Sequence, residues 1–250
     1  REPDIDMSAA GVLGLDVGNT CCTMAVMRHG TVQLIANEQG SRSTPTTVAF
    51  ADGETLLGEA AAAQAARNPK LTMSDLLLML GRDFDDPVVQ AARSRWGFLT
   101  SAAEKDGAVS VAVPGGKTHT AVRLLSLVVG GLRGAADSFC GAPVREVVLA
   151  TPAHLAPSRA DALLEAARGG GMRVKLALPS PLAVALLRVA EIEAAAAGGD
   201  GAGADAAGGG GAAPRRLLVV DVGGCCVSAS VVDLGEEPEG QAEGEAEREG

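Results

Sequence analysis

The strongest constraint on the fold is a short pattern that occurs twice, at residues 14–22 and again at residues 220–226. In each copy an apolar run ends in an aspartate, a glycine-containing turn follows, and a second β-rich run comes after the turn. A glycine turn between two strands lets backbone N–H groups converge on a phosphate, because no Cβ stands in the way. The aspartate at the end of the strand offers a hard oxygen ligand for Mg²⁺, most often through a water molecule.

Two such loops, one from each lobe, can close on the phosphates of a nucleotide from both sides. The predicted phosphate-binding residues come from the two turns and are Gly18, Asn19, Thr20, Gly223 and Gly224. The predicted metal-binding residues are the two aspartates, Asp16 and Asp221. The alternative is a pair of unrelated hairpins, because Asp-x-Gly turns are common between antiparallel strands. The second occurrence of the pattern favours the phosphate site.

The rest of the chain alternates between strand and helix patterns. Strands are predicted at residues 12–16, 23–27, 31–35, 46–50, 109–113, 144–150, 172–178, 217–221 and 227–234. Helices are predicted at residues 59–66, 74–80, 88–94, 120–138 and 182–195, and after Ser158, which has capping-box spacing to Asp161. Three strands in hairpin order, then helix, strand, helix and strand, is the element order of a ribonuclease-H-like sheet. Residues 37–113 are predicted to be an insertion in it. Lys117, which follows Pro114, Gly115 and Gly116, lacks the upstream spacing of a P-loop and is predicted to lie in a plain turn before the next helix.

Composition argues against several classes of protein. With 47% hydrophobic and 21% charged residues in a chain of 250, a core can be buried. Aromatic residues make up 2% and the net charge is −10, which argues against a nucleic-acid surface, because such surfaces stack bases on aromatic rings and are positively charged. No apolar run approaches the ~18 residues of a membrane span. The five cysteines include two adjacent pairs and do not resemble a secreted disulfide framework, so a cytoplasmic location is expected.

The domain organisation follows from shifts in composition along the chain. Residues 1–10 are predicted to be disordered, residues 11–195 to form a first lobe, and residues 214–235 to begin a second lobe. Residues 194–213 are Ala and Gly apart from two aspartates, which predicts a flexible linker insert. Residues 236–250 carry seven Glu and one Arg, which predicts an acidic, solvated tail.

Around the two repeats the sequence resembles the ATPase domain of the heat shock protein 70 family, the seventy-kilodalton chaperones, within the actin and sugar-kinase superfamily. Residues 36–50 are similar to the stretch that follows the family's first hairpin. Residues 80–86, Leu-Gly-Arg-Asp-Phe-Asp-Asp, are similar to a family segment that comes later in the same order and spacing. Shorter similarities lie at residues 58–60, 67–69, 151–153, 158–159 and 181–185. The resemblance covers residues 11–235 apart from the Ala/Gly insert. It implies an α/β fold of the actin-like ATPase type with an incomplete second lobe.

The resemblance also implies the ligands and partners. The family binds ATP or ADP with Mg²⁺, here expected to be bound weakly. The implied partners are a J-domain co-chaperone or a ribosome-associated chaperone partner, together with unfolded or nascent polypeptide bound by the rest of the chain. The implied role is in protein folding and the stress response.

Three positions that carry charge in the family are uncharged in this sequence. By the family's spacing, its catalytic lysine falls on Leu77, its metal-linked glutamate on Ser180, and the second aspartate of its later loop on Ser228. Such charges stabilise the transition state of phosphoryl transfer, so the resemblance implies weak or absent hydrolysis, as in the family's atypical ribosome-associated members. The alternative is an interaction scaffold that retains the actin-like fold without nucleotide. An active kinase of the same superfamily is disfavoured by Ser228.

The paired cysteines allow a different hypothesis. If the two loops face each other, Cys21, Cys22, Cys225 and Cys226 approach one site and could bind a soft metal or form a redox pair. Neighbours on a strand point to opposite faces, so at most one thiol of each pair can face the cleft. A role as small buried hydrophobic residues is the better account.

Overall fold

The computed structural model describes residues 11–28, 30–197 and 216–234, and side chains of the last helix as far as residue 192. The described chain divides into two compact units, one ending at Ser180 but including Asp221–Ser228, the other made of the remaining residues after Ser180. The predicted disordered start and the acidic tail, residues 1–10 and 236–250, lie outside the described residues. So does the predicted linker insert, apart from residues 194–197, which are helical.

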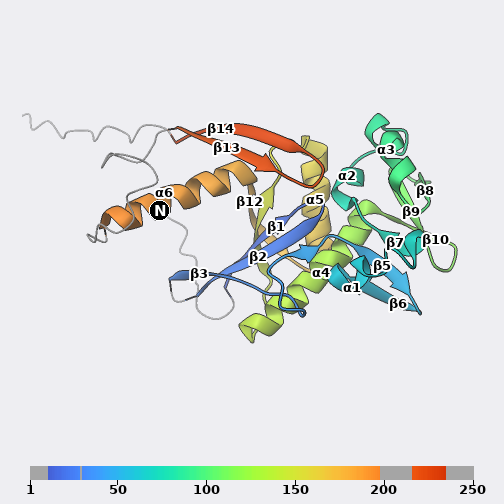
Figure 1. The fold of residues 1–250 in the computed structure, drawn as a ribbon, viewed down its shortest axis with the longest axis horizontal. Coiled ribbons are helices and arrows are strands. Elements are labelled where there is room, and N and C mark those ends of the chain that lie inside the picture. The colour runs from blue at the N-terminus through green and yellow to red at the C-terminus, as the bar shows by residue number, and fades with distance from the viewer. Residues whose placement is uncertain (1–10, 29, 198–215, 235–250) are drawn as a thin grey trace, which may run out of the picture. The chain divides into compact units, whose positions relative to one another are not determined.

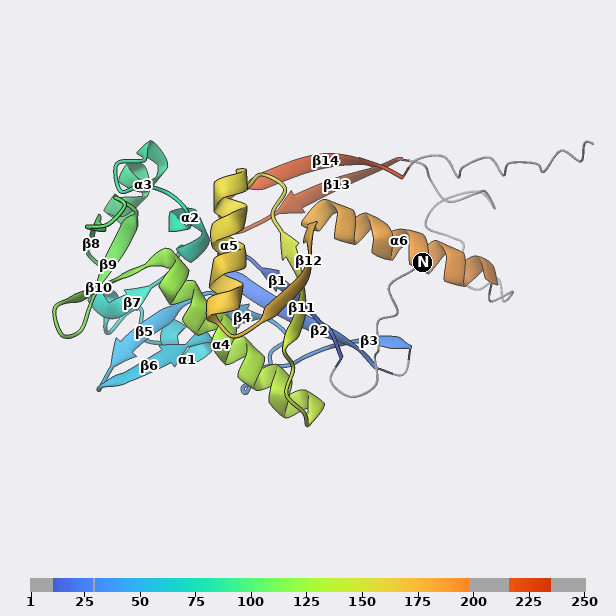
Figure 2. The ribbon, with the colours of Figure 1, turned by 180° about the vertical axis from the view of Figure 1, so that it is seen from behind.

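The first unit is built on a six-stranded sheet, whose main path runs in the order β12, β11, β1, β2, β3 (Figure 1; β11 is labelled in Figure 2). The strands on this path are β1 (Leu13–Val17), β2 (Cys21–Arg28), β3 (Thr31–Leu34), β11 (Glu146–Thr151) and β12 (Arg173–Pro179), and the sixth strand, β4 (Thr44–Pro45), pairs with β2. β1 pairs antiparallel with β2 and parallel with β11, and β11 pairs parallel with β12. This arrangement confirms the predicted actin-like α/β fold class.

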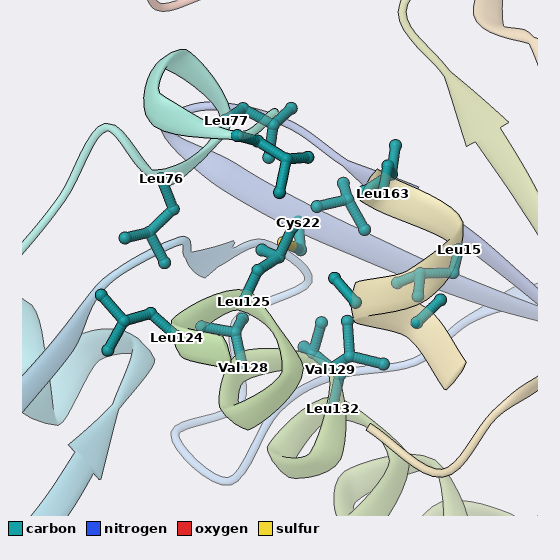
Figure 3. Packing of buried hydrophobic residues seen from close by; sticks show 14 of the residues in the cluster. Leu15, Cys22, Leu76, Leu77, Leu124, Leu125, Val128, Val129, Leu132 and Leu163 are labelled. Carbon is teal, nitrogen blue, oxygen red and sulfur yellow. The ribbon is translucent and has the colours of Figure 1, made fainter. Parts of the chain in front are cut away.

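Two helices, α4 (Ala121–Cys140) and α5 (Pro157–Gly169), pack against each other in the same unit (Figure 2). The N-cap of α4 is Thr120, whose hydroxyl accepts a hydrogen bond from the Arg123 N–H at 3.3 Å. Gly141 ends the helix with a φ of 69°, a left-handed conformation that glycine adopts without strain. Figure 3 shows how α4 buries its apolar face among Leu15, Cys22 and Leu163, which come from β1, β2 and α5.

The predicted insertion, residues 37–113, and the strand that follows it form two small antiparallel sheets. One contains β6 (Glu54–Leu57), β5 (Val48–Ala51) and β7 (Thr72–Met73), and the other contains β10 (Lys117–Thr120), β9 (Val109–Val113) and β8 (Thr100–Ala102). The helices between them are α1 (Gly58–Ala62), α2 (Leu76–Met79) and α3 (Pro87–Ala92), with 3-10 turns at Pro69–Leu71 and Arg93–Arg95. The predicted helices are therefore present but shorter than their sequence patterns suggested.

Three local predictions differ from the structure. β4 (Thr44–Pro45) pairs with β2, so two residues of the predicted insertion belong to the main sheet. Lys117 begins β10 and pairs with β9, whereas the sequence suggested a plain turn. The capping box of Ser158 and Asp161 is wrong, because α5 starts at Pro157 with Ala156 as its N-cap. Proline at the first helical position supplies the required φ and lacks only an N–H that would have no helical partner.

The second unit contains most of α6 (Ser180–Ala197) and most of a two-stranded sheet of β13 (Arg216–Val222) and β14 (Val227–Asp233). Arg216 and Asp233 form an ion pair between the two strands, with 2.8 Å between Nε and Oδ2. The turn of this hairpin, Asp221–Ser228, groups with the first unit. Within the described part of the chain, no helix combines the length and the apolar character needed to cross a bilayer.

Candidate functional site

The first predicted loop is a tight turn between β1 and β2. The Gly18 N–H donates a hydrogen bond to the Cys21 carbonyl at 3.0 Å, which closes the turn. A Cβ on Gly18 would lie 2.6 Å from that carbonyl oxygen. Since side-chain carbons do not approach a backbone oxygen so closely, this position requires glycine. The glycine of the first copy of the repeat is therefore required by the backbone geometry of the turn.

The second predicted loop repeats the same turn between β13 and β14. The Gly223 N–H donates to the Cys226 carbonyl at 2.9 Å, as Gly18 does to Cys21. Here a Cβ on the glycine would lie 3.4 Å from the carbonyl oxygen, so the turn is less tight. Glycine residues 223 and 224 are both exposed.

The structure brings the two loops together within the first unit. A Cβ on Gly224 would overlap the side chain of Thr20, so the loops are in contact at this point. The two predicted metal-binding residues are also near each other. Surrounding protein atoms partly desolvate the Asp16 carboxyl and raise its pKa, and the negative charge of Asp221 raises that pKa further. The predicted residues Asp16, Thr20, Asp221 and Gly224 thus share one site.

This arrangement of carboxylates fits a hydrated divalent cation. Asp16 and Asp221 repel each other, and a cation between them would relieve that repulsion. In the parts of the chain that the structure describes, no three side chains of His, Cys, Asp or Glu converge as a ligand set. Mg²⁺ does not need such a set, because it commonly keeps several waters and takes one or two carboxylates plus phosphate oxygens. The donors present therefore suit Mg²⁺ with a phosphate ligand.

The side chain of Asn19 is bound to the segment at the start of α2. Its amide nitrogen donates to Asp75 Oδ1 at 2.8 Å, and its amide oxygen accepts from the Leu78 N–H at 3.1 Å. Asp75 also accepts a hydrogen bond from the Trp96 indole at 2.9 Å. Asn19 therefore connects the first loop to α2, and a contact with phosphate can come only from its backbone.

Thr46 is a positioning residue that the sequence analysis missed. It is 1% exposed, its N–H donates to the Thr20 carbonyl at 2.9 Å, and its hydroxyl donates to the Gly18 carbonyl at 2.8 Å. The same hydroxyl lies 3.3 Å from the Cys22 thiol. No local pattern distinguishes this threonine from its neighbours, because its role depends on a strand pairing between distant segments.

Leu77, Ser180 and Ser228, which the sequence resemblance aligns with charged residues of the family, differ in their surroundings. Leu77 is 4% exposed and packs in the hydrophobic core (Figure 3). Its carbonyl accepts a hydrogen bond from the Arg159 guanidinium at 2.6 Å. Ser180 is half-buried at the start of α6, and Ser228 is half-buried in β14, close to the second loop in sequence. A lysine at position 77 would have to leave the core to reach a phosphate.

The cysteines of the first pair lie on opposite sides of β2, as the alternation of a strand predicts. Cys21 is exposed and Cys22 is buried. Burial raises the pKa of the Cys22 thiol to about 12, so this buried sulfur is protonated at neutral pH and is not a nucleophile. In the second pair, Cys225 is exposed and Cys226 is half-buried beside His154. The structure therefore gives no support for a four-thiol site.

Comparison with known proteins gives a consistent family. The family model described as Hsp70 protein matches residues 12–243. The putative heat shock 70 kDa protein 7 of Homo sapiens is 32% identical over 223 residues, which are 89% of this chain and 56% of that protein. The heat shock 70 kDa protein 2 of Paracoccidioides lutzii is 32% identical over 228 residues, which are 91% of this chain and 32% of that protein.

A ribosome-associated relative is also similar. A ribosome-associated molecular chaperone of Zygosaccharomyces rouxii is 35% identical over 177 residues, covering 70% of this chain and 29% of that protein. The chain thus spans between 29% and 56% of the length of these three relatives.

Proposed function

The chain belongs to the Hsp70 family of chaperones, and we propose that its two glycine loops bind the phosphates of ATP or ADP together with Mg²⁺. The observation that carries the proposal is the meeting of the two loops at Thr20 and Gly224, with Asp16 and Asp221 as neighbouring carboxylates. The Gly18 and Gly223 N–H groups close the two turns, so the proposed phosphate donors are the backbone N–H groups of residues 19–20 and 224–225. The two aspartates are the proposed metal-binding residues, through water.

The proposed binding step depends on charge balance. Mg²⁺ supplies positive charge that neutralises the phosphate oxygens when it is bound. Asp16 and Asp221 orient the hydrated cation, and the glycine turns let the backbone approach without a side chain in the way. Thr46 keeps the first turn in place through its hydrogen bonds to Gly18 and Thr20.

We propose that hydrolysis is weak or absent. Leu77, Ser180 and Ser228 stand where the family carries a lysine, a glutamate and an aspartate, and none of the three can supply charge to a transition state. Such interactions act mainly in the transition state, so their loss lowers the rate of hydrolysis while the ground-state complex can persist. The protein is in this view a divergent member that binds nucleotide without turning it over quickly.

The role of the whole protein is proposed from its relatives. One of them is named as a ribosome-associated chaperone, which favours a function in the cytoplasm beside nascent polypeptide, with a J-domain co-chaperone or an active chaperone as partner.

One observation favours a second candidate, an interaction scaffold without nucleotide. The contact of Thr20 with Gly224 leaves no space between the two loops at that point. A nucleotide would have to displace the Thr20 side chain or separate the loops. In a scaffold the same contact would simply be part of the fold.

A thermal-shift measurement on the full-length protein distinguishes the two candidates. Because a ligand that binds only the folded state stabilises it, Mg-ADP and Mg-ATP at 100 times the dissociation constant should add about 2.7 kcal/mol to the free energy of unfolding. Asp16→Asn should reduce this shift, and Asp52→Asn, a change of the same kind in the exposed turn between β5 and β6, should not. No shift at millimolar nucleotide would exclude the binding proposal and favour the scaffold.

A further inference from the structure

Cys226 and His154 form a thiol–imidazole pair at the edge of the second loop. The Cys226 sulfur lies 3.6 Å from His154 Nε2 and 3.8 Å from Nδ1. Both distances fall within hydrogen-bond range for sulfur, so the imidazole can accept the thiol proton in either orientation of the ring. The Cys226 carbonyl closes the second loop, but neither the thiol nor the imidazole has a role in the phosphate site described above.

The fold explains why these distant residues meet. His154 lies in the segment between β11 and α5, directly after the end of β11. Since β1 and β11 are parallel, with Asp16 opposite Ala150, their carboxyl ends lie at the same edge of the sheet. Cys226 is held by the turn in which its own carbonyl accepts the Gly223 N–H. Both residues belong to the first compact unit.

The other cysteines have different surroundings. Burial raises the pKa of Cys22 to about 12 and also raises the pKa of Cys140. The pKa of Cys225, which is exposed, is raised by partial desolvation and by its neighbour Cys226. Cys21 is exposed. Among the residues that the structure describes, the imidazole–thiol contact occurs at Cys226, which provides an internal comparison with exposed Cys21.

From this geometry we propose that Cys226 is a reactive thiol activated by His154, and that it is a site of oxidation by hydroperoxides. His154 takes the thiol proton, and the thiolate sulfur attacks one peroxide oxygen. The O–O bond breaks as the S–O bond forms, the imidazolium returns a proton to the leaving oxygen, and the products are a sulfenic acid and, from hydrogen peroxide, water. The sulfur loses two electrons and the peroxide gains them.

The experiment measures oxidation and alkylation of each cysteine in the full-length protein at pH 7. Hydrogen peroxide is added with a sulfenic-acid trap such as dimedone, and iodoacetamide labelling is followed in parallel, with both adducts located by peptide mass spectrometry. An imidazole that accepts the thiol proton makes the sulfur a better nucleophile. Cys226 should therefore react about tenfold faster than Cys21 in both assays.

Two histidine variants separate activation by His154 from mere exposure. His154→Asn should slow labelling of Cys226 by about tenfold and leave Cys21 unchanged. His119→Asn, the control on β10, should leave both rates unchanged. His154 is exposed, so loss of the imidazole is not expected to unfold the protein, and the melting temperature checks this. Cys226 reacting no faster than Cys21, or a His154→Asn variant that reacts like the wild type, would overturn the proposal.

The link to nucleotide rests on the proposed function. Cys226 follows the glycines of the second loop, so Mg-ADP should slow its labelling when added above the dissociation constant. If Cys226 reacts as expected but Mg-ADP neither protects it nor shifts the melting temperature, the proposed function fails while the reactive thiol stands. If Mg-ADP binds and Cys226 remains unreactive with or without it, the thiol proposal fails instead.

Discussion

The two glycine loops have the same turn but very different support. The first loop is joined to the core. Thr46 donates hydrogen bonds to the Gly18 and Thr20 carbonyls, and the Asn19 side chain binds Asp75, next to α2. The second presents Gly223, Gly224 and Cys225 to solvent. A repeated backbone pattern can therefore persist while its two copies differ in rigidity. We expect the backbone of the first loop to keep its conformation when a ligand binds, and the backbone of the second loop to change its conformation.

The largest loss of stability is expected from a charge placed in α2, the helix that Asn19 of the first loop contacts. Leu77→Lys puts an ammonium group in the hydrophobic core beside α4, and an unpaired buried charge costs about 3–5 kcal/mol. Leu77→Met, the control, keeps the volume and should cost less than about 1.5 kcal/mol. Urea unfolding measures both. A lysine variant as stable as the wild type would show that the side chain reaches the cleft, and its ATP hydrolysis should then be assayed.

A matched pair of glycine substitutions tests the difference between the loops directly. Gly18→Ala forces a Cβ to 2.6 Å from the Cys21 carbonyl, and the resulting strain should cost about 1–3 kcal/mol. Gly223→Ala places its Cβ at 3.4 Å from the Cys226 carbonyl and should cost less than about 0.5 kcal/mol. Chemical denaturation of the two variants side by side provides the measurement. Equal losses would mean that the loops are equally constrained.

Thr46→Val removes the hydroxyl that holds the Gly18 carbonyl but retains the shape of the side chain. A buried hydrogen bond of this kind contributes about 0.5–1.5 kcal/mol, so the variant should be destabilised by roughly that amount. Thr46→Ser retains the hydroxyl and should preserve the affinity for Mg-ADP better than the valine variant does. If Thr46→Val changes neither the free energy of unfolding nor the affinity for Mg-ADP, the Thr46 hydroxyl does not stabilise the first loop.

The smallest change in stability is expected from the ionisation of Asp16 as the pH changes. The pKa of Asp16 is higher in the folded protein than in the unfolded chain, so its ionised form weakens the fold. This cost is absent below the unfolded pKa and complete above the folded one. Asp16→Asn should therefore melt slightly higher than the wild type at neutral pH, and the difference should vanish in acid. A difference that grows as the pH falls would contradict this assignment.

Much of this architecture could be predicted from the sequence. The repeat located both turns, and the order of apolar runs predicted the main sheet, because alternating burial in β1 follows directly from alternating side chains. The capping box at Ser158 was misleading because Pro157 starts α5. Lys117 was missed as a strand residue because its pairing depends on β9. Each failure involves a partner or a competing local signal that the pattern does not include.

The candidate site was less predictable than the fold. Its aspartates and glycines could be located from the sequence, since these residues repeat. The sequence could not show that the Asn19 side chain faces Asp75, that Thr46 holds the first loop, or that His154 meets Cys226. These contacts join residues between 28 and 72 positions apart in the chain. They depend on how the strands pair and not on any local motif.

The central claim is that Asp16 and Asp221 act on one bound nucleotide. A double-mutant cycle tests it most directly, with the affinity for Mg-ADP measured by calorimetry for the wild type, Asp16→Asn, Asp221→Asn and the double variant. Each single change should weaken binding, and the two losses should be non-additive by about 0.5–3 kcal/mol, as for residues that share a partner. Strictly additive losses, or wild-type protein that binds no Mg-ADP, would contradict the claim.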